Sequence, residues 1–348
     1  MSAPRVLVLY NEPVLPAGHP AFASEHEIVE TAESAAHTLA DAGFEVRSLG
    51  VGADPTVLLT ELRRERPDVV FNLFEGLATH TGTEATVVGL LEWLGVPCTG
   101  SPSAALALAL DKSRTKHLLH GAGLPTPAFL AVEQLPVPAW SHGWPAIVKP
   151  ARQDASVGIE QASVVTSPEQ LARRCAWVLE RFGPPVLVEQ FIPGREFHVH
   201  VLEEVVLPGG RSLLLLPLAE IVFLEEGEGY WPIYSYDAKW APGSREYETT
   251  PLRSPVTLDA APMGRLTEIA RAAFDLLGCR DYARLDVRMT GGGEFFVLEV
   301  NPNPFLNSRA VLNGLQALGR TQRQFFLALV QAALARGAVA SRGAGKLD

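Results

Sequence analysis

Several residue types and patterns are scarce in this 348-residue chain, and each scarcity excludes a class of protein. The three cysteines, Cys98, Cys175 and Cys279, are too few and too far apart for a disulfide scaffold or a zinc site. No stretch approaches the roughly 18 unbroken apolar residues of a membrane-spanning helix, and the N-terminus lacks the pattern of a signal peptide. We therefore expect a cytoplasmic protein that has no membrane partner.

Positive charge is also limited. The formal net charge is -10 and no long basic run occurs, which argues against nucleic acid as a partner. Only five of the 29 basic residues are lysines, namely Lys112, Lys116, Lys149, Lys239 and Lys346. A lysine ammonium is a compact point charge that meets a phosphate differently from a planar guanidinium. In this arginine-rich chain, the lysines inside motifs are therefore candidate phosphate contacts.

The hydrophobic pattern predicts a mixed α/β and α+β protein of three domains. In residues 1–102, apolar strands alternate with helices, which is typical of a parallel sheet with both faces covered. Residues 103–187 form a second unit, and the strand-rich residues 188–336 form a third that ends in a helix at about 314–335. The segment 337–348, which contains glycine and arginine, is expected to be a disordered tail.

The strongest chemical pattern is RLDVRMTGGGEFFVLEVN, residues 284–301. Side chains two apart share one face of a strand, so Val297, Glu299 and Asn301 are expected on one face. A hairpin closed by a four-residue loop, Gly291–Glu294, places Asp286 opposite Glu299 and Arg284 opposite Asn301.

Two opposed carboxylates repel each other, and a divalent cation resolves that repulsion. Asn301 adds a third oxygen ligand, and Mg²⁺ prefers a few protein oxygens completed by water and phosphate. The alternative is a solvated strand on which Asp286 pairs with Arg284 or Arg288. The apolar run FFVLEV around Glu299 favours the metal site, because an unpaired charge there would be costly.

The order of motifs along the chain resembles the ATP-grasp ligases, and within them the D-alanine–D-alanine ligase family. The matching segments are SEHEIV, GLLEWLGVPCTGS, ALDKSRTKHLLHGAGLPTP, VKPARQDASVGI, VLVEQFIPGREF, YDAKW, RLDVR and LEVNPNP. The resemblance implies the ATP-grasp fold, with a Rossmann-like N-terminal domain and ATP held between two α+β domains. It also implies small amino-acid or carboxylate substrates and a homodimer.

The resemblance assigns roles to residues at matching positions. Arg284 would be the catalytic arginine, and Glu25 would hold the amino group of a substrate. Asp286, Glu299 and Asn301 would hold Mg²⁺ or Mn²⁺. The residues implied to contact ATP are Lys112, Lys149, Ser156, Glu189, Gln190, Phe191, Ile192, Glu196 and Lys239. Among them, Glu189 to Ile192 would frame the adenine, and Glu196 would bind the ribose.

The substrate half departs from the family pattern. A loop serine is replaced by Ala155, and a tyrosine that would hydrogen-bond with it is replaced by Trp240. A glycine near the acyl group is Phe305, and a serine that binds the acceptor carboxylate is Ala310. The His-Gly pair of the first domain corresponds to Glu75-Gly76. Substrate-binding candidates are therefore Glu25, Trp240, Asn303 and Arg309, the last as a bidentate carboxylate clamp.

These residues predict a ligase that converts a carboxylate into an acyl phosphate and then joins it to an amine, releasing ADP and phosphate. Three alternatives remain open: an authentic D-alanine–D-alanine ligase, a small-molecule kinase, and a nucleotide-binding protein without catalysis. The intact Arg284, Asp286, Glu299 and Asn301 argue against loss of catalysis.

Overall fold

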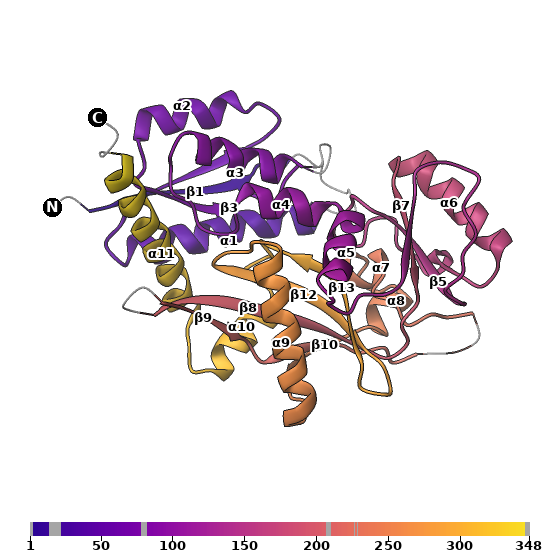
Figure 1. The fold of residues 1–348 in the computed structure, drawn as a ribbon. Coiled ribbons are helices and arrows are strands. Elements are labelled where there is room, and N and C mark those ends of the chain that lie inside the picture. Colours follow the sequence, from indigo (N-terminus) through magenta and orange to yellow (C-terminus); the bar gives the residue numbers. More distant parts are fainter. Residues whose placement is uncertain are drawn as a thin grey trace.

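The computed structural model describes residues 3–13, 22–77, 82–206, 210–225, 227 and 229–344. They form three units, each built on its own sheet, as Figure 1 shows. The N-terminal unit lies above the C-terminal sheet, and the central unit lies at the right of the view. The predicted fold class is confirmed.

The N-terminal unit is a three-stranded parallel sheet of order β2-β1-β3. Its elements are β1 (Arg5–Asn11), α1 (Phe22–Ala40), β2 (Glu45–Val51), α2 (Thr56–Glu65), β3 (Val69–Leu73) and α3 (Thr83–Trp93). The strand–helix alternation predicted from the sequence is therefore confirmed. Loops that follow parallel strands lie together at one edge of a sheet, and this places Glu75, after β3, at that edge.

The central unit carries an antiparallel sheet of order β4-β7-β5-β6. Its elements are α4 (Ser103–Leu110), α5 (Lys112–Gly121), β4 (Phe129–Val132), β5 (Ala146–Pro150), the 3₁₀ turn Gln161–Ser163, β6 (Val164–Val165), α6 (Pro168–Phe182) and β7 (Val186–Gln190). Helix α6 covers one face of this sheet by packing Leu171, Cys175 and Val178 against Val148 and Val188.

The C-terminal unit has the strand order β11-β10-β8-β12-β13, with β9 paired to β8. Its elements are β8 (Arg195–Val206), β9 (Gly210–Leu215), β10 (Leu218–Ile221), α7 (Tyr236–Trp240), α8 (Arg245–Glu248), β11 (Leu252–Val256), α9 (Ala260–Leu276), β12 (Tyr282–Met289), β13 (Phe295–Asn301), α10 (Arg309–Ala317) and α11 (Gln322–Ala344). Helix α9 covers one face, where Phe274 and Leu266 join Val199 and Leu285 in a core. The other face carries the polar residues of the predicted site.

Two expectations about the C-terminus are wrong. The single helix expected at 314–335 is two helices, α10 and α11, separated by a turn in which Gly319 has a φ of 67°. The segment 337–344, expected to be disordered, continues α11, and residues 345–348 lie outside the described part. Helix α11 returns to the N-terminal unit, where Phe326 packs on Phe71 with ring centroids 5.1 Å apart. Figure 1 shows this crossing.

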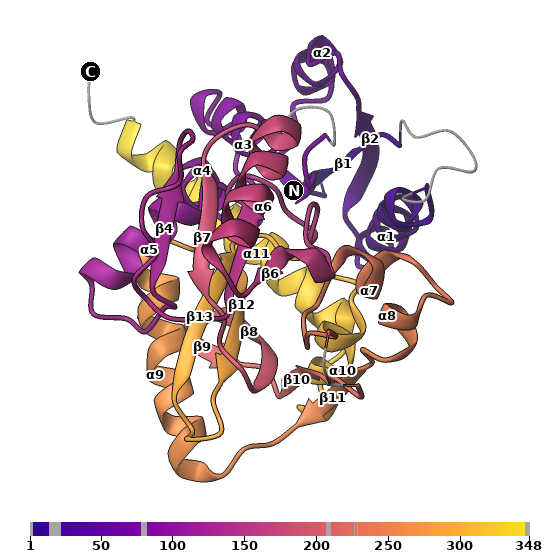
Figure 2. The same ribbon diagram turned by 90° about the vertical axis from the view of Figure 1, so that its right-hand side faces the viewer.

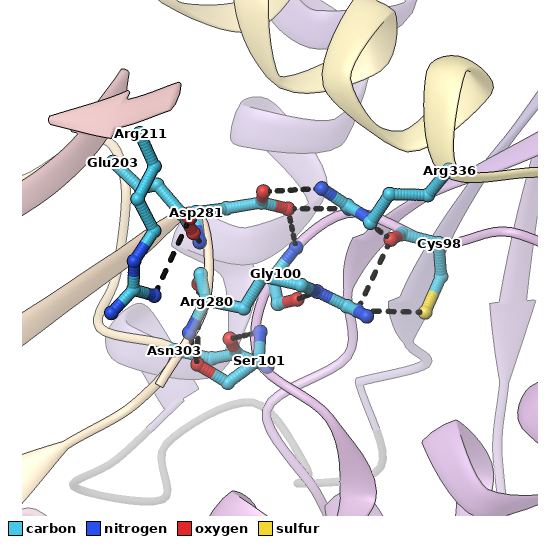
Figure 3. A network of polar contacts seen from close by, with 9 residues as sticks. All are labelled: Cys98, Gly100, Ser101, Glu203, Arg211, Arg280, Asp281, Asn303 and Arg336. Carbon is cyan, nitrogen blue, oxygen red and sulfur yellow. Dashed lines mark hydrogen bonds and ion pairs between the residues drawn. The ribbon is translucent and has the colours of Figure 1, made fainter. Parts of the chain in front are cut away.

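A buried polar network joins the N-terminal and C-terminal units (Figure 3). At its centre, the carboxylate of Asp281 accepts hydrogen bonds from Gly100 N at 2.8 Å and from the Arg336 guanidinium at 2.7 and 2.8 Å. Arg280 Nε donates to Gly100 O at 2.7 Å, and Ser101 N donates to Asn303 Oδ1 at 2.8 Å. The network fixes the N-terminal unit against the C-terminal unit.

The predicted domain boundaries stay a proposal, and one of them cuts an element. The boundary between residues 187 and 188 falls inside β7, whose residues pair with β4 and β5 along the whole strand. A boundary after Gln190 keeps the central sheet intact. Among the described helices, none is long and apolar enough to cross a membrane.

Candidate active site

A pocket lies between the open face of the central sheet and the open face of the C-terminal sheet. Strand β5 alternates: Ala146 and Val148 pack under α6, whereas Ile147 and Lys149 line the pocket. Figure 2, turned by 90°, shows the central sheet in front of β8 and β12. The lining includes every residue that the resemblance assigns to ATP: Lys112, Lys149, Ser156, Glu189, Gln190, Phe191, Ile192, Glu196 and Lys239.

A buried carboxylate in this pocket holds two lysines. Lys149 Nζ lies 2.6 Å from Glu189 Oε2, and Lys116 Nζ forms an ion pair with Glu189 Oε1. Burial lowers the pKa of Lys149 to about 8, and burial together with Lys149 lowers the pKa of Lys116 well below its usual range. Glu189 therefore holds both lysine side chains at one wall of the pocket.

Lys116 was not predicted as a site residue. It lies one helical turn after Lys112 on α5, at the i+4 position, and donates to Thr126 Oγ1 at 2.9 Å. The i, i+4 spacing of two lysines in a lysine-poor chain was the signal that could have identified it.

Lys112 connects the hairpin with residues 151–158, the loop after β5. The resemblance identifies this segment as the loop that covers the phosphates, and it is called the phosphate loop below. Its Nζ lies 3.1 Å from Asp154 Oδ1 and 3.5 Å from Glu299 Oε2. Burial lowers the pKa of Lys112, but these two carboxylates outweigh burial and raise it overall. The lysine is therefore a fixed positive charge between the loop and Glu299.

Glu196, predicted to bind the ribose, is held by Arg288. Arg288 Nε donates to Glu196 Oε2 at 2.9 Å, and its NH1 donates to the carbonyl of Ile192 at 2.8 Å. The Arg288 guanidinium therefore links Ile192, in the segment predicted to frame the adenine, to the carboxylate of Glu196. Both charged side chains are buried.

The register of the β12–β13 hairpin is confirmed where it matters, since Asp286 pairs with Glu299 and Arg284 pairs with Asn301. The predicted loop length is wrong, because Met289 pairs with Phe295 and leaves five residues between the strands. A bulge after Asp286 absorbs the difference. It turns Val297 into the core beneath α9 and Leu298 into the pocket, so Val297 does not share a face with Glu299.

Arg284 and Asp286 form a bidentate ion pair, with Nε at 2.6 Å from Oδ1 and NH2 at 2.9 Å from Oδ2. The alternative pairing that the sequence left open is thus present. Burial raises the pKa of Asp286 to about 7, against the effect of Arg284 and reinforced by Glu299. Burial also acts on Glu299, but Lys112, then Lys239 and Lys149, bring its pKa well below the usual range.

The residues present fit a divalent cation. The two carboxylates face each other across the hairpin, and Asn301, whose amide oxygen could add a third ligand, follows Glu299 two residues later on β13. A cation would relieve the carboxylate repulsion that raises the pKa of Asp286. Within the described ranges, no cluster of three or more His, Cys, Asp or Glu forms a closed metal cage. Two carboxylates and an amide form an open ligand set that leaves positions for phosphate oxygens and water.

The phosphate loop is held in a strained conformation. Ala155 and Ser156 both have left-handed φ values, 55° and 62°, which cost a non-glycine residue about 1 kcal/mol or more each. Two hydrogen bonds hold them there: Trp240 Nε1 donates to the Ala155 carbonyl at 3.1 Å, and Ser156 Oγ donates to the Tyr234 carbonyl at 2.9 Å. The two departures from the family pattern, Ala155 and Trp240, therefore contact each other.

Two glutamates of the N-terminal unit, Glu75 and Glu84, lie near charged residues of the other units. Burial, then Glu27, raises the pKa of Glu75, although solvent still reaches its side chain. Burial, then Asp154 and Glu75, raises the pKa of the half-buried Glu84. At Glu75, the positive charge of Arg284 opposes this shift and lowers the pKa.

Other predicted substrate residues lie around this region. Asn303 uses both amide atoms at the unit junction, since Oδ1 accepts from Ser101 N and Nδ2 donates to Glu84 Oε1 at 3.3 Å. Arg309 is exposed at the first residue of α10. The backbone of Glu25 belongs to α1, but its side chain lies outside the described part. The substrate roles of these residues and of Trp240 stay predictions.

Two histidines that the sequence analysis did not use lie beside Arg284. In β8, His200 pairs with Arg284 and His198 pairs with Asp286. Burial, followed by Arg284, lowers the pKa of His200 to about 3 and that of His198 well below its usual range. The alternation in FHVHV could have shown that both imidazoles share a face with the hairpin residues.

Comparisons with known proteins agree with this geometry. The family model described as the D-ala D-ala ligase C-terminus matches residues 118–330. The D-alanine–D-alanine ligase of Pseudomonas entomophila is 34% identical over 329 residues, covering 92% of this chain and 91% of that protein. The ligase of the same name from Aquifex aeolicus is 32% identical over 293 residues, covering 83% and 89%.

The fold also matches a solved structure. The crystal structure of D-alanine–D-alanine ligase from Bacillus anthracis complexed with ATP superposes with a TM-score of 0.73 and 20% sequence identity. The match covers 98% of this chain and 100% of that one. At this identity the likeness establishes the fold alone.

Proposed function

Because the chain belongs to the D-alanine–D-alanine ligase family, we propose that it joins two amino-acid-like substrates by an amide bond through an acyl phosphate formed with ATP. Family membership makes it an ATP-dependent ligase that forms a C–N bond and uses a divalent cation. The observation that carries the proposal is the hairpin, which places Arg284, Asp286 and Glu299 on a face next to a lysine-lined pocket.

ATP would occupy the pocket between the two sheets. Phe191, Ile192 and Ile147 supply an apolar wall for the adenine ring, and Glu196 is fixed by Arg288 near the ribose end. Lys112, Lys149 and Lys239 surround Glu299 and would neutralise the phosphates. Asp286, Glu299 and Asn301 would hold Mg²⁺ or Mn²⁺, which supplies charge neutralisation and orientation of phosphate oxygens.

The reaction has two steps. A carboxylate oxygen of the first substrate attacks the γ-phosphorus, and the bond to the bridging oxygen breaks to release ADP. The amine of the second substrate then attacks the acyl carbon, loses a proton, and phosphate departs. Arg284 would stabilise the oxyanion of the tetrahedral intermediate, while the lysines act by positioning and electrostatics.

The relatives' names make D-alanine a candidate substrate. The changed positions Ala155, Trp240, Phe305 and Ala310 favour a different amino-acid pair, because site chemistry rather than fold determines the substrate. Phe305 packs on the core and Ala310 is buried, so neither offers a polar side chain to a carboxylate.

The test is ATP-dependent phosphate release across a matrix of D- and L-amino-acid pairs, with products identified by mass. A pair that yields a peptide supports the ligase and names its substrates. A stable phosphorylated compound formed without any amine would show that the protein is a small-molecule kinase and not a ligase. If neither product forms although the protein still binds ATP, the protein is a nucleotide-binding protein without catalytic activity.

We also propose a homodimer in the cytoplasm, on the family resemblance alone. Light scattering coupled to size exclusion measures the mass in solution. A mass near 75 kDa, twice the chain mass of 37.5 kDa, supports the dimer, and a mass near 37.5 kDa contradicts it.

A further inference from the structure

Two buried imidazoles lie on β8 beside Arg284 and Asp286. Strand β8 alternates so that Phe197, Val199 and Val201 pack under α9, and His198 and His200 therefore point to the opposite face. The strand register places them next to Asp286 and Arg284 on that face. The exposed fractions are only 8% for His198 and 3% for His200.

Three buried polar atoms on the residues paired with Arg284 and Asp286 have no hydrogen-bond partner among the described residues: His198 Nε2, His200 Nδ1 and Asn301 Nδ2. His198 Nε2 lies 3.8 Å from Asp286 Oδ1, which is too far for a hydrogen bond. Each buried polar atom left unpaired costs about 1–3 kcal/mol. Three such atoms around one arginine indicate a polar group that arrives with a ligand.

The position of the imidazoles separates them from the nucleotide. His198 packs against Tyr234, a pocket residue, with ring centroids 5.9 Å apart, whereas His200 lies two residues further along β8. Neither histidine lines the nucleotide pocket. They continue the sheet face that carries Arg284 and Asp286 beyond the lining of the nucleotide pocket.

We propose that His198 and His200 form a subsite that hydrogen-bonds a polar side chain, a hydroxyl or a carboxamide, of the amino acid lying over Arg284. This inference rests on the proposed ligase function. The reacting carboxylate of that substrate is already matched by Arg284 and the cation site, so the imidazoles are additional to what an amino acid with an apolar side chain needs. A methyl group at this place would leave both imidazole nitrogens unpaired.

The test compares isosteric substrates that differ in polarity: serine with 2-aminobutyrate, and asparagine with leucine, each as both enantiomers. We expect the full-length enzyme to prefer the polar member by about 10-fold or more in kcat/KM. His200→Leu should bring that ratio close to one without changing the KM for ATP. His200→Asn, whose amide nitrogen lies near the position of Nδ1, should retain part of the preference.

His198 has its own matched variants. His198→Leu should reduce the ratio and His198→Gln, whose amide reaches the position of Nε2, should restore part of it. His120→Leu, an exposed histidine at the end of α5, is the control. Equal kcat/KM values for the polar and apolar members in the wild-type enzyme would overturn the subsite, and this comparison needs no variant.

The failure of the ligase function gives a different result. If the protein condenses no amino acid, the same pairs are titrated into it by calorimetry in the presence of a non-hydrolysable ATP analogue. Their affinities then test the subsite independently of catalysis. The subsite is supported if serine and asparagine bind more tightly than 2-aminobutyrate and leucine, and if His200→Leu abolishes this difference. Binding that does not distinguish polar from apolar members contradicts it.

Discussion

At the scale of single residues, charge balance at the hairpin determines what the site can do. Arg284 neutralises Asp286 through two short hydrogen bonds, while Glu299 is balanced by lysines from the other wall of the pocket. A cation that binds between the carboxylates would weaken the hold of Asp286 on Arg284. The guanidinium would then be available to an oxyanion on the substrate.

Arg284→Ala should lower kcat by about 10²–10³ or more, the usual effect of removing an oxyanion donor. ATP binding should persist, because Arg284 does not line the nucleotide pocket. Steady-state kinetics and ATP titration measure the two effects. The control is Arg253→Ala, which changes an exposed arginine on β11. Normal turnover in Arg284→Ala would show that Arg284 has no catalytic role.

Glu84 should make the protein less stable as the pH rises. Its folded-state pKa is raised, so the stability it contributes is present below pH 4.5 and is lost as the pH rises toward about 8. Glu84→Gln should therefore stabilise the protein at pH 8 by an amount of order 1 kcal/mol, since partial exposure screens the charge. Urea unfolding at pH 5 and pH 8 measures this difference. A stabilisation that is equal at both pH values would show that the ionisation of Glu84 is not its source.

At the scale of elements, α7 and the phosphate loop act as one unit. Trp240 on α7 holds the carbonyl of Ala155, and the loop carries left-handed Ala155 and Ser156 across the pocket. In the family pattern a serine and a tyrosine occupy these two positions. Here an indole N–H and a backbone carbonyl connect the same two segments, so the connection does not need either hydroxyl.

Trp240→Phe keeps an aromatic ring and removes the donor. We expect the KM for ATP to rise several-fold, because one hydrogen bond of about 1 kcal/mol no longer holds the loop closed. The kcat should change less, since Trp240 is not in the hairpin. Trp93→Phe, an exposed tryptophan on α3, is the control. An unchanged KM for ATP would show that the contact does not position the loop.

The elements also show what the sequence could predict. Alternation and a four-residue loop, Gly291–Glu294, placed Asp286 against Glu299, and this pairing was correct only because the bulge at Leu298 offsets the fifth loop residue. The bulge at Leu298 could not be predicted, since pairing beyond Asp286 depends on how Val297 packs under α9. Lys116 and the two histidines were missed because their importance comes from burial beside residues distant in sequence.

At the scale of the whole molecule, the last helix belongs to the first unit. Phe326, Leu329 and Val330 of α11 pack with strands β1 and β3, although the periodicity of α11 gave no sign of its partner. This packing and the network around Asp281 hold the N-terminal and C-terminal units together (Figure 3). Both are long-range contacts, which local sequence patterns do not encode.

Asp281→Asn should loosen this junction. Asparagine tolerates the left-handed φ of 63° and still accepts from Gly100 N, but it loses the charge that holds Arg336. We expect a loss of about 2 kcal/mol in the free energy of unfolding. Cys98, whose carbonyl accepts from Arg336, should react with thiol reagents faster than in the wild type.

Two internal references keep this test specific. Cys175, buried in the central unit, should keep its slow reaction in the same variant. Asp275→Asn, which breaks a solvent-exposed pair with Arg211, should have little effect on stability. If Cys98 and Cys175 become reactive together, the variant unfolds the protein globally and the junction does not open as a separate unit.

The central claim is that the hairpin and the lysine pocket activate a carboxylate as an acyl phosphate. The most direct measurement uses the productive amino-acid pair with ¹⁸O in the carboxylate of the first substrate, followed by mass analysis of the phosphate. The two-step reaction predicts one ¹⁸O atom transferred to each phosphate for each peptide formed. Peptide formation with unlabelled phosphate would contradict the acyl phosphate and with it the proposed roles of Arg284, Asp286 and Glu299.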